Sequence, residues 1–180
     1  EKKQILSYAD SQGFIDGTLP HETAHLIFRD FVGFKGEVPL WLDEGVAQWT
    51  EEPKREIVKT AAKNLLNGGM LFSVEDMMNL DIGKVTSTMI VKIRSIRGGN
   101  GNRRLLALNG DAMVNIYYIE AASLVRFLIE RYGTSSFTDF CRQLRDGKSL
   151  AEALSFAYPT RISSVDELEN KWLKYLRTEN

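Results

Sequence analysis

The sequence has few cysteines, histidines and prolines: 180 residues include one cysteine, two histidines and four prolines. The single cysteine, Cys141, excludes an internal disulfide framework. A net charge of −1 provides no global field to attract nucleic acid or an anionic membrane. No uninterrupted apolar run approaches the ~20 residues that a membrane span needs. We therefore expect neither a nucleic-acid partner nor a membrane span in this chain.

The length favours a single domain over residues 1–180. A chain of this size can bury roughly 70% of the surface that it exposes when unfolded, so it needs no disulfide or metal to hold a core together. Apolar residues make up 43% and charged residues 26%, which is typical of soluble globular proteins. Because the chain begins with Glu1 rather than methionine, we expect a processed protein or a piece of a longer one.

Helical periodicity and chain-breaking residues divide most of the chain into helices. Pro20 suits the first turn of a helix, and apolar residues and histidines then recur at helical spacing as far as Val32. Glycines and a proline predict a loop at 33–39. Serines three residues before an acidic residue predict N-terminal caps at Ser73, Ser149 and Ser164. Further helices are expected at 40–51, 53–66, 73–79, 112–133, 135–147, 149–158 and 164–177.

Two regions favour β-structure. Residues 4–15 predict a short edge strand followed by a loop, and residues 85–109 predict a β-hairpin with GGNGN as its turn. The fold class is therefore α+β, predominantly helical. The hairpin region is locally basic, which we interpret as a solvated strand face in preference to a site for an anionic ligand. Its basic residues are Lys84, Lys92, Arg94, Arg97, Arg103 and Arg104.

Both histidines lie in the segment LPHETAHLIF, residues 19–28. Four positions apart on an α-helix, His21 and His25 lie on one face, about 40° from each other. Two imidazoles placed in this way can reach one metal ion. Glu22 projects about 100° from His21, so it can contact a bound water rather than the ion, as in the H-E-x-x-H pattern. The alternative is a helix with two incidental histidines, and composition gives that coincidence a chance of roughly one in a thousand.

A catalytic zinc ion takes a third protein ligand and leaves a fourth position for water. The candidate is Glu44 in WLDEG, which lies 19 residues after His25 on the next expected helix. If the loop at 33–39 joins the two helices as an antiparallel pair, Glu44 returns to the histidines. The neighbouring Asp43 would serve equally well by charge, and spacing does not separate the two.

The segment HETAH, the eighteen-residue gap and Glu44 in WLDEGVA together resemble the gluzincins of the peptidase MA clan, in particular the aminopeptidase N-like branch. The resemblance implies a zincin-like domain with one Zn²⁺ ion held by His21, His25 and Glu44. It favours Glu44 over Asp43, because the ligand in that family is the glutamate before the glycine.

The same resemblance suggests roles for two more residues. It implies that Glu51, seven residues after Glu44, orients a ligating histidine; the alternative is a solvated helix end. The segment YIEAASLVRFL (118–128) resembles the family's helix whose first tyrosine donates a hydrogen bond to the oxyanion. That residue is Tyr118 here, with an aromatic core position as the alternative, whereas we expect Tyr117 to pack in the core. The family's lysine and glycine after the tyrosine are replaced by Glu120-Ala121, so this match is incomplete.

The resemblance covers residues 18–51 closely and 118–176 loosely, and the hairpin at 85–109 is an insertion relative to it. The methionine-glutamate-asparagine segment with which aminopeptidases bind a free amino group has no counterpart in ADSQGFIDG, so aminopeptidase specificity is not carried over. The helical C-terminal third resembles small bacterial peptidase MA-like domains, which are often found in exported proteins and point to an extracytoplasmic location.

We therefore expect a zinc-dependent metallopeptidase that acts on a peptide or protein substrate, with Glu22 as general base and Tyr118 as oxyanion donor. The main alternative is a catalytically inactive polypeptide-binding module with a structural or vestigial zinc site. A closed structural site would need a fourth ligand such as Cys141, for which a buried packing role in mid-helix is the simpler interpretation. A metallohydrolase acting on other substrates is a third reading, and the sequence offers nothing to separate it.

Overall fold

The computed structural model describes residues 14–33, 38–96, 103–159 and 161–178. Helices dominate, and the strands form a small antiparallel sheet, so the chain is α+β and predominantly helical. The helices are α1 (Leu19–Val32), α2 (Leu40–Thr50), α3 (Glu52–Gly68), α4 (Val74–Asn79), α5 (Gly110–Arg145), α6 (Leu150–Ala157) and α7 (Val165–Thr178), and the strands are β1 (Ile90–Ile96) and β2 (Arg103–Asn109).

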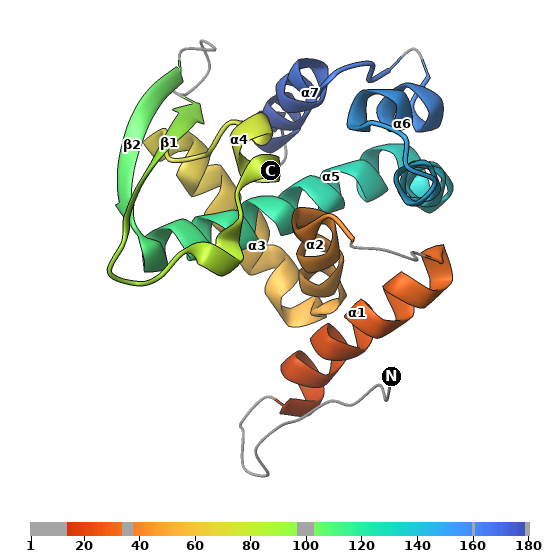
Figure 1. Cartoon of the computed structure of the whole chain (residues 1–180), viewed down its shortest axis with the longest axis horizontal. Coiled ribbons are helices and arrows are strands. Elements are labelled where there is room, and N and C mark those ends of the chain that lie inside the picture. The colour runs from red at the N-terminus through yellow and green to blue at the C-terminus, as the bar shows by residue number, and fades with distance from the viewer. Residues whose placement is uncertain (1–13, 34–37, 97–102, 160, 179–180) are drawn as a thin grey trace.

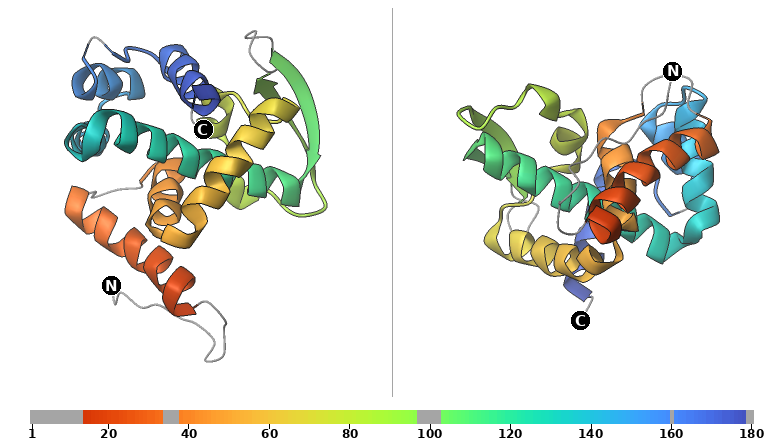
Figure 2. Two further views of the ribbon diagram at one scale, coloured as in Figure 1. Left: turned by 180° about the vertical axis from the view of Figure 1, so that it is seen from behind. Right: turned by 90° about the horizontal axis from the view of Figure 1, so that it is seen from below.

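The long helix α5 passes through the middle of the molecule, and the other elements pack around it (Figure 1). In this view α1 and α2 lie below α5, α6 and α7 lie above it, and the hairpin stands near its N-terminal end. The view from behind shows α3 crossing α5 on the other side, and α1 is an outer helix on its face of the molecule (Figure 2). Helix α1 therefore contacts the body mainly through α2.

Local signals account for most helix ends. Pro20 lies in the first turn of α1, Ser73 caps α4, and Ser149 with Glu152 forms a complete capping box at α6. The expected box at α7 differs in detail. Ser164 Oγ accepts a hydrogen bond from the amide of Glu167. The Glu167 carboxylate, however, accepts from the amide and the hydroxyl of Ser163 rather than from the amide of Ser164.

Helix α5 contains the break that the sequence predicts. Gly133 has φ 87° and ψ 160°, so two helical segments meet there inside one long element. Among the described residues, α5 is the one helix long and apolar enough to cross a membrane by length and composition. However, 67% of its most apolar stretch is buried in the protein, as expected for a central core helix. Cys141 lies in the second segment, 1% exposed, and burial raises the pKa of its thiol to about 12.

The hairpin is present, but its first strand begins at Ile90 rather than near 85, because a 3₁₀ turn at Ile82–Lys84 and a loop precede it. Its tip, residues 97–102, lies outside the described part of the chain. On its other side β1 contacts the segment 71–73, through a bridge between Phe72 and Ser95. The predicted strand at 4–15 falls mostly on residues outside the described ranges, and Phe14–Thr18 forms a π-helical turn instead.

The basic residues of the hairpin are largely matched by acidic partners or carbonyl groups. These contacts agree with a solvated strand surface in preference to an anion site, while Arg97 lies outside the described residues. Arg94 pairs with Asp76 and Glu75, Arg103 with Asp166 and Glu169, and Lys84 with Asp81, while Arg104 donates to the carbonyls of Gly68 and Gly69.

Candidate metal centre

Helices α1 and α2 bring three potential metal ligands together. His21 Nε2 and His25 Nε2 lie 3.2 Å apart, and Glu44 Oε2 lies 3.6 Å from the first and 3.9 Å from the second. The two histidines are one helical turn apart on α1, and Glu44 faces them from α2. In the described part of the chain, these three residues form a group that could hold one metal ion.

The spacing of the three atoms suits a zinc ion. A point equidistant from them lies about 2.1 Å from each, the circumradius of a triangle with sides of 3.2, 3.6 and 3.9 Å, and typical zinc–nitrogen and zinc–oxygen distances are roughly 2.0–2.2 Å. Two imidazoles and one carboxylate are also a donor set that zinc uses in catalytic sites. The side chains are 19%, 18% and 16% exposed, so the group is open to solvent.

The second ring nitrogen of each histidine faces a buried carboxylate. His21 Nδ1 lies 3.0 Å from Glu51 Oε1, and His25 Nδ1 lies 3.1 Å from Asp43 Oδ1. The first pair is a well-formed hydrogen bond, whereas the second is close but poorly aligned. Carboxylates in this position fix the orientation of a ligating imidazole and leave Nε2 free for the metal. Asp43 in turn accepts from Arg29 Nη2 at 2.7 Å.

These contacts shift the pKa of both histidines upward. The nearby Glu44 carboxylate raises the pKa of His21 most, burial opposes it, and Glu51 adds to the rise. Asp43 raises the pKa of His25 in the same way against burial. Burial acts to raise the pKa of Asp43, but His25 and Arg29 outweigh it and hold that pKa below its ordinary value. The pocket is thus built to stabilise positive charge on or between the rings.

One contact explains why α2 lies where it does. Gly45, directly after Glu44, packs against α5 so closely that an added Cβ would stand 2.6 Å from Ala121 O. At the end of α2, Thr50 Oγ1 donates to Ala47 O in its own helix at 2.7 Å and lies only 3.4 Å from the Pro20 carbonyl of α1. The glycine therefore sets the distance of α2 from the core helix, and Glu44 is carried with it.

The remaining predicted residues lie around this group. Glu22 is exposed on α1, next to His21. Tyr118 is half-buried on α5, and both burial and the charge of Glu44 raise its pKa. Tyr117 is only 1% exposed, as expected for a packing residue, and its pKa is raised by the same two causes. The two tyrosine rings meet edge to face, with centroids 5.8 Å apart.

The sequence did not predict that Asp43 contacts His25, or that Arg29 pairs with Asp43. Asp43 entered only as a rival ligand to Glu44, yet its carboxylate lies against Nδ1 of His25 rather than with the three ligand atoms. A signal was present, because Arg29 follows His25 by four residues and therefore shares its face of α1. Which acidic group this cation meets is given by the structure, in which Arg29 pairs with Asp43 on the neighbouring helix.

Comparisons of this chain with protein-family models, with curated proteins and with solved structures find no match.

Proposed function

We propose that this chain is a zinc-dependent peptidase of the gluzincin type. One observation carries the proposal: Nε2 of His21, Nε2 of His25 and Oε2 of Glu44 lie 3.2–3.9 Å from one another, around a point at zinc-binding distance from all three. The H-E-x-x-H pattern adds a glutamate, Glu22, beside that point.

In this proposal each residue has a separate task. His21, His25 and Glu44 hold the ion, and Asp43 and Glu51 orient the imidazoles. A bound zinc ion lowers the pKa of water from 15.7 to about 7 and polarises a carbonyl group. Glu22 accepts the proton of the attacking water and passes it to the leaving amine. The Tyr118 hydroxyl donates a hydrogen bond to the oxygen of the attacked carbonyl, where negative charge develops.

The exposure of the three ligands favours a catalytic site over a structural one. A structural zinc ion is enclosed by four protein ligands, whereas a catalytic ion keeps one position for water. The group here has three members in the described part of the chain and each is 16–19% exposed. A glutamate next to the ion has no task in a structural site, but it is the expected base for hydrolysis.

Elemental analysis and a casein digest test the proposal directly. We expect about one zinc ion per chain and hydrolysis that a chelator abolishes and added zinc restores. Glu22→Gln should keep the zinc and lose roughly 10²–10⁴-fold in rate, the usual contribution of general-base catalysis. The matched control is Glu56→Gln, because the Glu56 side chain is 75% exposed on α3 and takes no part in the centre.

The outcomes separate the alternatives. Stoichiometric zinc without any hydrolysis of casein would refute the peptidase and leave the inactive polypeptide-binding module or a hydrolase of another substrate. Wild-type hydrolysis by Glu22→Gln would show that another group is the base. A chain that neither binds zinc nor cleaves casein would refute the proposal altogether.

A further inference from the structure

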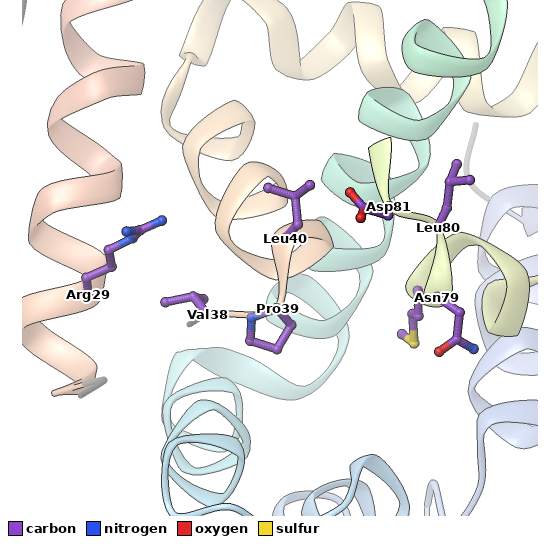
Figure 3. Close-up of a pocket in the computed structure, with 8 residues that line it drawn as sticks. Arg29, Val38, Pro39, Leu40, Asn79, Leu80 and Asp81 are labelled. Atoms are coloured by element: carbon purple, nitrogen blue, oxygen red, sulfur yellow. The ribbon is translucent and has the colours of Figure 1, made fainter. Parts of the chain in front are cut away.

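We infer that the groove between Arg29, residues 38–40 and residues 78–81 binds an extended polypeptide substrate beside the metal centre, with a bulky apolar side chain seated in it. The groove has a volume of about 850 Å³ and lies between the end of α1, the start of α2 and the end of α4. In Figure 3, Arg29 extends from α1 toward the start of α2, Leu40 projects from the first turn of α2, and Asn79, Leu80 and Asp81 lie on the segment at the end of α4. The inference rests on the proposed function, because it takes the metal centre as the place of cleavage.

The first support is the position of the groove on α1. Arg29 follows Glu22 by seven residues, so the two side chains lie about 20° apart after two helical turns. The side of α1 that carries the proposed base therefore leads directly to the groove. Arg29 also contacts Asp43, and Asp43 contacts His25, so one chain of contacts joins the groove wall to the centre.

The second support comes independently from α2. Leu40 precedes Glu44 by four residues, so both lie on one face of that helix, one turn apart. Leu40 is 38% exposed and lines the groove. Both helices that supply the proposed metal ligands thus also supply walls of the groove, on the faces that carry Glu22 and Glu44.

The chemistry of the walls selects the ligand. The walls are mixed, with polar and apolar groups in about equal parts. The apolar groups include Val38, 8% exposed, and the more accessible Leu40 and Leu80, while Arg29, Asn79 and Asp81 supply exposed polar groups. Such a wall can seat an apolar side chain while its polar groups bond the neighbouring backbone and fix the orientation. Arg29 meets Asp43 through Nε and Nη2, so its Nη1 can donate to a carbonyl of the bound chain.

Distance then favours a polypeptide over a single amino acid or a dipeptide. Two helical turns separate Glu22 from Arg29, which is about 10 Å along the axis of α1. Extended chain advances about 3.3 Å per residue. A substrate that places its scissile carbonyl beside Glu22 and a side chain in the groove must therefore extend roughly three residues past the cleaved bond.

The test fills the groove from opposite walls with Leu40→Trp and, separately, Asn79→Trp. The control is Ile57→Trp, because Ile57 is 66% exposed on α3 and lies outside the groove. The probe is fluorescein-labelled oxidised insulin B chain, and its binding to zinc-loaded Glu22→Gln protein is followed by fluorescence anisotropy. Each tryptophan variant is examined in this background for binding and in the active protein for cleavage.

We expect both groove variants to weaken binding about tenfold or more and to raise KM for the B chain by a similar factor. Turnover at saturation should stay within about twofold, and Ile57→Trp should match its parent. Circular dichroism checks the fold of each variant. If Leu40→Trp does not fold, the binding and KM of Asn79→Trp alone test the inference.

Failure of this inference is distinct from failure of the proposed function. If the wild-type chain cleaves the B chain and both groove variants bind and cleave it equally well, the groove has no part in binding and the peptidase stands. If filling the groove abolishes binding but zinc-loaded wild-type protein cleaves nothing, the groove stands and the peptidase fails. A chain that neither binds nor cleaves the B chain overturns the inference, and the casein digest then decides the proposed function.

Discussion

His21 and His25 each use their two ring nitrogens differently. Each Nε2 faces Glu44, and each Nδ1 faces a carboxylate of its own. With neutral imidazoles, three carboxylates stand here beside two cationic side chains, Arg29 and Lys54, which pair with Asp43 and Glu51. A surplus of one negative charge is left at Glu44, and positive charge on or between the rings, from a proton or from the proposed metal ion, would offset it.

Asp43→Asn tests the orientation of His25. The change removes the charge that faces Nδ1 but keeps the shape of the side chain, and we expect zinc affinity to fall about 10–100-fold. Glu44→Gln should lose far more, because it removes a ligand. Competition with a calibrated chelator measures both. The control is Asp139→Asn, whose side chain is 50% exposed. A larger loss from Asp43→Asn than from Glu44→Gln would exchange the two roles.

Tyr118→Phe tests the proposed oxyanion donor. Removal of its hydroxyl should lower turnover by about 10²–10³, the usual cost of one oxyanion donor, with zinc content unchanged. Tyr117→Phe is the matched control, because Tyr117 is the adjacent residue and its ring is buried in the core. Steady-state kinetics on zinc-loaded protein distinguish the two. A loss confined to Tyr117→Phe would identify that hydroxyl as the donor instead.

The proximity of His21 and His25 was predictable from their spacing, because it follows from helical geometry alone. Their proximity to Glu44 required an assumption about how two helices pair, and the structure places it beside them. Spacing could not separate Asp43 from Glu44. Consecutive residues on a helix diverge by about 100°, so which of the two reaches the Nε2 atoms depends on the rotation of α2, which its packing against α5 determines.

At the scale of elements, that rotation depends on Gly45. An added Cβ there would lie 2.6 Å from both Ala121 O and Val125 Cγ2. Backbone atoms of α5 cannot yield as a flexible side chain can, so a larger residue must push the two helices apart. Gly45 thus affects the position of Glu44 indirectly, because it determines how closely α2 packs against α5.

Gly45→Ala should therefore destabilise the protein by about 1–3 kcal/mol, the range for overpacked core positions, and should also weaken zinc binding. The control is Gly68→Ala at the end of α3, where the added Cβ meets only Met70 Cγ, at 3.5 Å. Urea unfolding and chelator competition on the same samples measure both effects. Gly45→Ala protein with wild-type stability and zinc affinity would contradict this account of α2.

The helices were predictable because their signals are local, as the caps at Ser73 and Ser149 and the break at Gly133 illustrate. The first strand was placed about five residues too early because its limits depend on distant contacts. Gly110 at the start of α5 packs against Thr86, where an added Cβ would stand 1.9 Å from the carbonyl oxygen. This close packing holds Thr86 against the helix rather than in the strand.

At the scale of the whole molecule, buried carboxylates join the sheet to the helical body. Glu120 on α5 accepts a hydrogen bond from the Phe72 amide, and Glu169 on α7 accepts one from the Val74 amide at 2.9 Å. The segment that carries these two amides, residues 72–74, borders β1 through the bridge between Phe72 and Ser95. Helices α5 and α7 therefore hold the segment that lies between β1 and the helical body.

The Glu120 contact makes stability depend on pH. Burial raises the pKa of Glu120 well above its ordinary value of 4.5, the Phe72 hydrogen bond opposes this, and the charge of Glu169 adds to it. The folded protein thus keeps a proton that the unfolded chain releases near pH 4.5. The resulting stabilisation is complete below that pH and declines as the pH rises toward the pKa of the folded state.

Glu120→Gln separates this charge effect from packing. Glutamine keeps the acceptor for Phe72 but cannot ionise, so the variant should unfold at a similar temperature to wild type in acid and at a higher temperature at alkaline pH. Thermal unfolding from pH 4.5 to pH 9 gives both curves, and Asp139→Asn, whose side chain is 50% exposed, should follow wild type throughout. Parallel curves for Glu120→Gln and wild type would mean that the Glu120 carboxyl has the same pKa in the folded and unfolded chains. Protonation of Glu120 would then make no contribution to the stability of the contact between the helices and the segment beside β1.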